Sequence, residues 1–437
     1  MRALTFVASV PLIGLTSAAA GGTLSFDIET IVADNMFNNR PTTAVDSNGV
    51  VHTAFMTQFD TDDSSKEIIY ANNAGGSWNF TPITDNNVRE EFPDLALDDD
   101  GNVHITVHTG TGNGNKIRYV NDIGGSFGPI IDITGEGYVI PELAIDSQGT
   151  VHFTFRTQTL STGIEEVYYT TWTSDGGVGP LENISATPVS DSRASQIAVG
   201  PDDDVHIVYQ EGNPFGGDLI YVNNASGVFQ EVTTGVTQAM VDPIVLVSDE
   251  DVVNILYRAD DFMWAVDDGG TGSFSSPLQV HDEDALPAFY ADFALDAQGR
   301  RHLAFASNVG ELQGIIYIAE NEDGFAEPQT LVDTDATNLG TSIGVNDNGG
   351  IAVTYSLSGF DSKEDVVFAD LFAATTTIGD ACPADIDGDD GVVNVNDLLT
   401  LLANWGTGGA GADLASPSDV VNVADLLELL AQWGPCD

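Results

Sequence analysis

The chain alternates short apolar segments with turns rich in Asp and Gly, in a pattern that recurs about every fifty residues. The stretch PDLALDDDGNVHITVHTG from Pro93 contains an apolar run, an Asp/Gly turn, and a second run in which apolar and polar residues alternate. Alternation with a period of two is typical of a strand with one buried face, and Asp-Gly pairs favour tight turns. Each repeat is therefore predicted to begin with a β-hairpin.

Seven such hairpins follow one another along the sequence. Related phrases start at residues 41, 93, 141, 195, 243, 291 and 341. Most copies continue with a third strand such as KIRYVND, and often with a Gly-rich turn and a short fourth strand. Repeats of this length that consist of four short strands are typical of propeller blades. We predict an all-β, seven-bladed propeller over residues 21–377.

The two ends of the repeat array predict how the ring closes. The seventh copy stops after its third strand (DVVFADLFA), whereas LSFDIETIVADN, residues 24–35, precedes the first copy. This segment would supply the missing strand and leave no open sheet edge. The pattern resembles secreted seven-bladed propellers that include sialidase-like repeat proteins, a resemblance that implies a fold more than a function. A sialidase would also need an arginine triad and usually an RIP motif, and no RIP occurs here.

Composition points to an exported, soluble protein. The chain holds 67 acidic and 12 basic residues, a net charge of −55, yet 42% of it is apolar, which is enough to bury a core. Such a surface repels nucleic acid and anionic membranes and attracts divalent cations. Arg2, an apolar run from Leu4 to Leu15 and small residues up to Ala20 predict a signal peptide over residues 1–20. No other run is long enough for a membrane span, so we expect a secreted or surface-associated protein.

Five histidines share one position of the repeat: His52, His104, His152, His206 and His302. A residue repeated around a ring is expected to serve the fold, with a ring nitrogen bonded to the neighbouring turn. The position four residues later varies among the copies and holds His108, Arg156, Gln210 and Arg258 in copies two to five. We place this variable position at the upper face, the face at which the second strands of the blades end. His104 is therefore predicted to support stability and His108 to contact a ligand.

Nearly all cations of the mature chain are also predicted at or near the upper face. They are Arg40, Lys66, Arg89, Lys116, Arg118, Arg156, Arg193, Arg258 and Lys363. In so acidic a protein, this segregation indicates a binding site for an anionic ligand such as a uronic-acid-containing or sulfated glycan. The alternative is that these loops are long and therefore carry charges of both signs without binding a ligand. The candidate ligand-binding residues are His108, Arg156, Arg258, Gln210, Arg89, Arg193, His281 and Tyr290.

Two alternatives to glycan binding stay open at this point. The first is a polysaccharide lyase or glycoside hydrolase on the same scaffold, and the second is a purely structural surface adhesin. A lyase that acts on uronates needs a cation beside the carboxylate and a His or Tyr that takes the α-proton. The groups available for this chemistry are His108, His281, Tyr138, Tyr290 and Arg156. The sequence assigns no catalytic residue.

A duplicated segment forms the predicted second domain, residues 378–437. ADIDGDDGVVNVNDLLTLLANWG from Ala384 and ADLASPSDVVNVADLLELLAQWG from Ala412 align without a gap. They resemble the type I dockerin family, whose repeat is a calcium loop followed by a helix. Oxygen ligands at this spacing suit Ca²⁺. The predicted ligands are Asp385, Asp387, Asp389, Asn394 and Asp397 in the first loop, and Asp413, Asn422 and Asp425 in the second, weaker loop. Both loops are one residue longer than the family's usual loop.

The dockerin resemblance implies a cohesin-like partner on a scaffold or cell surface, reached through exposed leucines of the helices. Each predicted helix carries apolar residues at helical spacing and a tryptophan, Trp405 or Trp433, that we expect in the core. Cys382 and Cys436 are the two cysteines and flank the duplication. They are predicted to form a disulfide in an oxidising compartment. A pair of thiolate metal ligands is the alternative, although no histidine or third cysteine accompanies them.

Overall fold

The computed structural model falls into two compact units, residues 1–347 with 351–375 and residues 348–350 with 376–437, which are described separately. The described residues are 24–34, 36–58, 66–158, 163–187, 190–213, 216–237, 239, 243–259, 262–280, 289–309, 312–321, 324–334, 338–360, 366–376, 392–393, 395–405, 426, 429 and 434–435. The predicted signal peptide, both cysteines and all predicted calcium ligands except Asp397 lie outside them.

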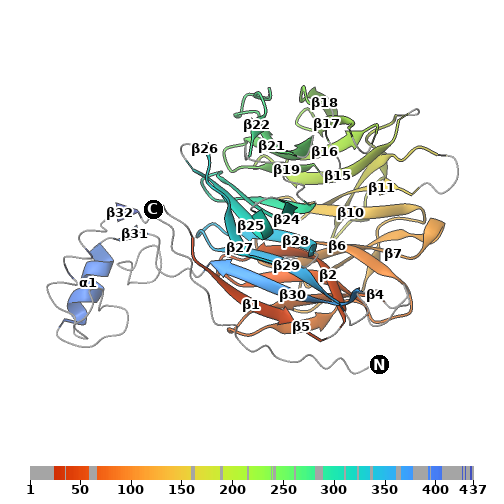
Figure 1. The fold of residues 1–437 in the computed structure, drawn as a ribbon. Coiled ribbons are helices and arrows are strands. Elements are labelled where there is room, and N and C mark those ends of the chain that lie inside the picture. The colour runs from red at the N-terminus through yellow and green to blue at the C-terminus, as the bar shows by residue number, and fades with distance from the viewer. Residues whose placement is uncertain are drawn as a thin grey trace. The chain divides into compact units, whose positions relative to one another are not determined.

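The first unit consists of seven blades in chain order, one for each repeat, and a parallel pairing of Phe37 with Ala369 joins the sheets of blades 7 and 1 (Figure 1). Blade 1 holds β2 (Phe37–Val45), β3 (Val51–Gln58), β4 (Lys66–Asn72) and β5 (Asn79–Pro82). Blade 2 holds β6 (Glu90–Leu97), β7 (Val103–Thr109), β8 (Lys116–Asn121) and β9 (Ile131–Asp132). Blade 3 holds β10 (Tyr138–Ile145), β11 (Val151–Thr157) and β12 (Val167–Thr173), with β13 (Gly177–Val178) and β14 (Glu182–Asn183) both paired to β12.

The remaining four blades repeat this plan. Blade 4 holds β15 (Ser192–Val199), β16 (Val205–Glu211), β17 (Asp218–Asn223) and β18 (Gln230–Thr233). Blade 5 holds β19 (Ile244–Val247), β20 (Val253–Ala259), β21 (Phe262–Asp267) and β22 (Leu278–Gln279). Blade 6 holds β23 (Phe289–Leu295), β24 (Arg301–Val309), β25 (Leu312–Asn321), β26 (Gly324–Phe325) and β27 (Gln329–Val332). Blade 7 holds β28 (Asn338–Val345), β29 (Ile351–Phe360), β30 (Val366–Thr376) and β1 (Phe26–Val32).

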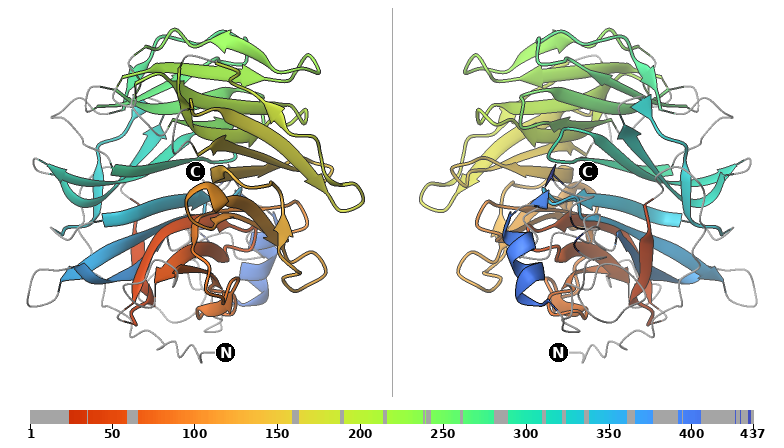
Figure 2. Two further views of the ribbon diagram at one scale, coloured as in Figure 1. Left: turned by 90° about the vertical axis from the view of Figure 1, so that its right-hand side faces the viewer. Right: turned by 90° about the vertical axis from the view of Figure 1, so that its left-hand side faces the viewer.

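The first strand of the chain completes the last blade, as predicted. β1 pairs with β30, and both views of Figure 2 draw the red and blue ends of the array side by side. The side chain of Asn38 in β2 donates to the carbonyl of Ala369 in β30 (3.2 Å). Ile31, Phe55 and Leu371 belong to one buried cluster that joins blade 7 to blade 1. The first unit is thus a closed seven-bladed propeller.

Every blade packs against the next through a separate apolar cluster. Apolar side chains of the second strand of one blade contact those of the preceding blade. Between blades 2 and 3, Phe153 and Val151 of β11 pack with Tyr119 of β8. Equivalent clusters lie at the other six interfaces. Since each sheet is apolar on both faces, the second strands read as nearly continuous buried runs such as VHITVHT. The hydrophobic effect therefore stabilises the ring interface by interface.

A bulge near the start of the first strand in blades 1–4, 6 and 7 shapes the central channel. The pairing register shifts by one residue after Asn39, Glu91, Val139 and Arg193. The next residue, Arg40, Phe92, Ile140 or Ala194, has a positive φ between 52° and 54°. Residues other than glycine rarely adopt this conformation, so its recurrence shows that the bulge is a regular part of the repeat structure. The bulge turns the residues that follow it toward the channel.

The described part of the second unit contains α1 (Val395–Ala403) and a pairing of β31 (Val392–Val393) with β32 (Gly434–Pro435). Leu401 in α1 and Leu429 in the second repeat are both buried, whereas Leu399, Leu402 and Trp405 are exposed. The prediction that Trp405 belongs to the core is therefore wrong, because the buried stripe of this short helix is narrower than its apolar pattern. Among the described residues, no helix is long and apolar enough to span a membrane.

Candidate functional site

The repeated histidines bond to a tyrosine of the third strand in all five blades. The His Nδ1 atom lies 2.6 or 2.7 Å from the tyrosine hydroxyl in the pairs His52–Tyr70, His104–Tyr119, His152–Tyr169, His206–Tyr221 and His302–Tyr317. The Nε2 atom faces an aspartate of the hairpin turn, at 3.2 Å from Asp98, 3.3 Å from Asp146 and 3.1 Å from Asp296. The predicted bond to the turn is confirmed in blades 2, 3 and 6, and the tyrosine contact in all five blades indicates that these histidines serve the fold.

These contacts determine which ring nitrogen of the imidazole carries the proton. In blade 2, Asn121 donates to the Tyr119 hydroxyl oxygen (2.9 Å), so the hydroxyl hydrogen is directed to Nδ1 of His104. His104 then carries its proton on Nε2 and donates to Asp98. Burial lowers the pKa of His104 below its usual value, so the ring is neutral at pH 7.

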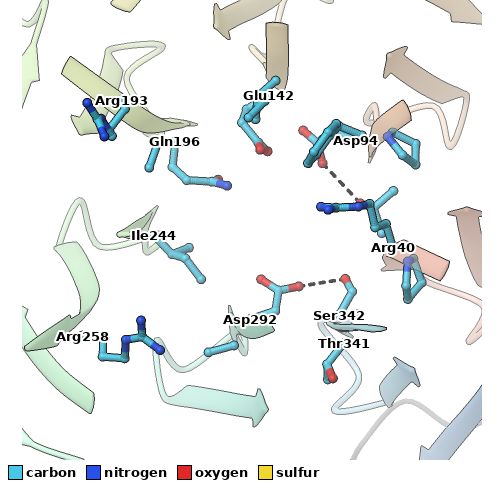
Figure 3. Close-up of a pocket in the computed structure, with 18 of the residues that line it drawn as sticks. Arg40, Asp94, Glu142, Arg193, Gln196, Ile244, Arg258, Asp292, Thr341 and Ser342 are labelled. Atoms are coloured by element: carbon cyan, nitrogen blue, oxygen red, sulfur yellow. Dashed lines mark hydrogen bonds between the residues drawn. The ribbon is translucent and has the colours of Figure 1, made fainter. Parts of the chain in front are cut away.

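The central channel of the propeller contains a cavity of about 420 Å³ (Figure 3). Its walls are formed by residues of the bulges and by the ends of two second strands. The polar and charged lining residues are Arg40, Thr42, Asp94, Glu142, Arg156, Arg193, Gln196, Arg258, Asp292, Thr341 and Ser342. The cavity therefore brings together four arginines and three carboxyl groups, contributed by blades 1 to 6.

Asp94 and Glu142 form a hydrogen-bonded acid pair on one side of this cavity, where Figure 3 shows them as neighbours. The carboxylate of Asp94 accepts from the backbone N–H groups of Leu95 (2.9 Å) and Leu143 (2.8 Å). Burial raises the pKa of Asp94 to about 6 despite these donors. Burial and then the charge of Asp94 raise the pKa of Glu142 well above its usual range. Glu142 is thus the member of the pair that keeps its proton to higher pH, and it donates a hydrogen bond to Asp94.

Asp292 faces the same space from blade 6. Its carboxylate accepts from the Ser342 hydroxyl (2.7 Å) and from the backbone N–H groups of Phe293 (2.8 Å) and Ile343 (3.0 Å). Burial raises its pKa. Asp94 and Asp292 share one role. Each accepts one hydrogen bond from a backbone N–H of its own blade and one from a backbone N–H of the next blade, that of Leu143 or Ile343. Both aspartates therefore tie neighbouring blades together while facing the cavity.

The arginines lie on the walls of the cavity and are partly neutralised by acidic neighbours. Arg156 and Arg193 both pair with Glu165, the latter at 3.3 Å. Arg193 also pairs with Asp191 (2.5 Å). Arg40 places its guanidinium 4.0 Å from the centre of the Phe92 ring. An anionic group that enters the cavity would meet planar donors from several blades.

Three of the predicted ligand-binding residues, Arg156, Arg193 and Arg258, line the cavity. The others that the structure describes do not. His108 is buried in blade 2, stacks on Phe92 at 5.0 Å and lies 3.6 Å from Glu91. Arg89 pairs with Glu91 as well. His281 lies outside the described residues, and Tyr290 is described only as part of strand β23.

Gln210 belongs to the framework rather than to the cavity lining. It is fully buried, and its amide donates to the carbonyls of Ala239 (2.6 Å) and Asn213 (3.0 Å). The sequence also failed to single out the acids of the cavity, Asp94, Glu142 and Asp292. The signal that would have found them is the second residue of the repeat phrase, which varies as Thr42, Asp94, Glu142, Gln196, Ile244, Asp292 and Ser342.

No protein-family model matches the chain, and no curated protein is significantly similar to it. Among solved structures, it is similar to the α-L-arabinanase of Penicillium chrysogenum with arabinobiose (13% identity, 74% of this chain and 98% of that chain, TM-score 0.46). It is also similar to the intramolecular trans-sialidase of Ruminococcus gnavus (11% identity, 78% and 94%, TM-score 0.45) and to the Aleuria aurantia lectin with α-methyl-L-fucoside (12% identity, 69% and 97%, TM-score 0.42). At these values, the similarities carry no argument about function.

Proposed function

We propose that the protein is a secreted binding protein whose central cavity takes the acidic end of an extracellular glycan. The observation that carries this proposal is the gathering of four arginines in one cavity of a chain that has only 12 basic residues in total. Guanidinium groups suit carboxylate and sulfate ligands because they donate two parallel hydrogen bonds. The cavity volume of about 420 Å³ is in the range of small-ligand sites and fits one or two sugar units.

The carboxyl and amide groups complement this anion site. Glu142, Gln196 and Asp292 lie where they can exchange hydrogen bonds with sugar hydroxyls. Because the pKa of Glu142 is raised well above its usual range, the acid pair contributes less negative charge than two ionised carboxylates would. A ligand with one acidic group and several hydroxyls therefore matches the cavity better than a neutral sugar or a simple anion.

The test compares Arg258→Ala with Arg300→Ala by titration calorimetry of the full chain. Oligosaccharides of uronic acids or sulfated sugars serve as ligands, with their carboxyl-reduced or desulfated forms as neutral counterparts. Arg258 lines the cavity, whereas Arg300 lies in the turn between β23 and β24 and pairs with Asp296 (2.7 Å). We expect Arg258→Ala to weaken binding roughly 10- to 100-fold, the effect of losing hydrogen bonds to a charged group. Equal affinity for acidic and neutral forms, or an equal loss in both variants, would contradict the proposal.

A glycoside hydrolase on the same scaffold is the second candidate, and Glu142 is the observation in its favour. A general acid must hold a proton at the working pH, which the raised pKa of Glu142 favours, and Asp292 would be the candidate base. Release of reducing ends from an oligosaccharide that binds, and its loss in Glu142→Gln with binding retained, would support hydrolysis. Unsaturated products that absorb ultraviolet light would instead indicate a lyase. Binding without any product supports the binding protein.

For the second unit, we propose a calcium-dependent tether to a cohesin-like partner. The repeated loop sequence supports it, and so do the exposed Leu399 and Leu402 of α1 and Trp405 just after its end, which offer an apolar contact surface. The full chain should capture an immobilised type I cohesin domain in Ca²⁺ and release it in chelator. Asp385→Ala and Leu402→Asp should both abolish capture, whereas Asp100→Ala, in an exposed turn of blade 2, should not. Capture that persists in chelator would reject the calcium dependence.

A further inference from the structure

A second cavity, of about 150 Å³, lies between blades 4 and 5 at the hairpin-turn end of the ring, and is called the blade 4–5 cavity here. It is lined by three carboxylates, Asp204, Asp251 and Asp268, together with His206 and the rings of Tyr221 and Phe274. None of the described lining residues is a lysine or arginine. The cavity is therefore strongly negative, which favours a cation.

His206 differs from the other repeat histidines in one respect. In three blades, Nε2 of the equivalent histidine lies 3.1 to 3.3 Å from an aspartate of its own turn, and in blade 1 it lies 3.7 Å away. Blade 4 carries Gly200 at the position of that aspartate. As a result, Nε2 of His206 is buried, faces the blade 4–5 cavity and has no hydrogen-bond partner. Buried polar atoms without partners are rare and call for a missing ligand or water.

The backbone of Gly200 borders this site closely. A Cβ atom at residue 200 would lie 3.0 Å from Nε2 of His206 and 3.4 Å from Oδ1 of Asp251. These two polar atoms therefore border the same small volume, which an aspartate side chain occupies in other blades. Asp268 is held as a fixed charge, because it accepts from the backbone N–H groups of Val253 and Gly270, both at 3.0 Å.

We propose that the blade 4–5 cavity binds a divalent metal ion that keeps its inner water shell, and that this shell bonds to His206, Asp204 and Asp251. Among the described residues, no group of three or more His, Cys, Asp or Glu side chains is arranged to chelate an ion directly, which favours a hydrated ion. At roughly 30 Å³ for each water, the volume suffices for an ion with several waters. Magnesium and manganese retain such waters readily.

Binding of this kind changes the tautomer of His206. A metal-bound water donates its hydrogen atoms outward, so Nε2 must offer its lone pair and Nδ1 must carry the proton. Nδ1 then donates to the Tyr221 hydroxyl oxygen, which lies 2.6 Å away, and the hydroxyl hydrogen, which Asn223 (3.3 Å) otherwise directs to Nδ1, turns away from the ring. His104, His152 and His302 keep their proton on Nε2 because an aspartate accepts it. The tautomer of one ring among equivalent rings is therefore a site-specific signal.

The test is NMR of the full chain with ¹⁵N-labelled histidine rings. With Mg²⁺, His206 should change from the Nε2–H to the Nδ1–H tautomer while His152 does not, and Mn²⁺ should broaden the His206 signals selectively. Gly200→Asp restores the repeat aspartate and should abolish both effects. Asp251→Asn should weaken the ion affinity at least tenfold, whereas Asp99→Asn, an exposed turn residue of blade 2, should leave it unchanged.

Two results would overturn the proposal. If Mg²⁺ leaves the tautomer of His206 unchanged and Mn²⁺ broadens His206 no more than His152, the cavity holds water only. If the broadening persists in both Gly200→Asp and Asp251→Asn, the ions associate with the acidic surface in general. Should Gly200→Asp fail to fold, the comparison of Asp251→Asn with Asp99→Asn still decides the matter.

Discussion

Glu90→Gln should make the protein more stable at pH 8 and leave its stability at pH 5 unchanged. Glu90 in β6 is completely buried against Glu67 of β4, between blades 1 and 2. One carboxyl oxygen of Glu90 accepts from Thr109 (3.0 Å) and Asn86 (3.1 Å), and the other has no donor among the described residues. Burial raises the pKa of Glu90 from 4.5 to about 7. A proton on Glu90 is donated to Glu67, which explains how two acids share this interface.

The sign of the effect follows from which state holds the proton. In the unfolded chain Glu90 loses its proton near pH 4.5, whereas in the folded chain it does so near pH 7. The stability from this group is complete below pH 4.5 and is lost as the pH rises toward and through 7. A difference of that size corresponds to about 3 kcal/mol of unfolding free energy. Glutamine reproduces the protonated acid, so the variant should avoid this loss.

The assay is urea unfolding followed by tryptophan fluorescence at several pH values between 5 and 8. The quantity of interest is the difference between variant and parent, because the many other carboxylates then cancel. Glu136→Gln, in an exposed loop of blade 2, is the matched control and should give a difference that does not vary with pH. A flat difference for Glu90→Gln, or one that turns unfavourable at pH 8, would refute the reasoning.

Three further changes test other parts of the fold. Tyr119→Phe removes the hydroxyl that bonds to His104 and should lower the free energy of unfolding in urea by about 1–3 kcal/mol. Tyr355 is an equally buried ring, and its hydroxyl has no hydrogen bond among the described residues, so Tyr355→Phe should lower that free energy by less. Deletion of residues 23–35 removes β1 and should lower the melting temperature or cause aggregation, and an unchanged melting temperature would reject closure by β1. His108→Ala should lower the unfolding midpoint, because it empties a buried site beside Phe92, and full retention of stability would show that the neighbours refill it.

The sequence predicts those features of the propeller that depend on local pattern. Alternation, turn residues and the fifty-residue period place the blades, and the incomplete seventh copy predicts the pairing of β1 with β30. The role of His104 was predictable as well, because a contact to the residue's own turn is local. These properties repeat from blade to blade, and a single sequence is enough to read them.

The candidate site depends on geometry that no local pattern contains. Arg40 and Asp94 face the channel because a bulge with positive φ turns the strand there, and only the closed ring brings them near Arg258. His108 was expected at the open mouth because its position varies among the copies. It is instead covered by Phe92 and Glu91, which the same bulge brings against it. Variation among the copies thus marks positions free of the repeat's constraints, whether they are buried or open.

The net charge of −55 does not by itself exclude an anionic ligand. At physiological ionic strength, charges farther than about 8 Å apart are largely screened from each other, so the acidic outer surface acts weakly inside the channel. The ligand instead meets the groups of the cavity at contact distance. There, Arg40, Arg156, Arg193 and Arg258 line the walls, and the raised pKa of Glu142 lowers the negative charge of the acid pair. We therefore expect the cavity to select an acidic sugar while the outer surface repels other polyanions.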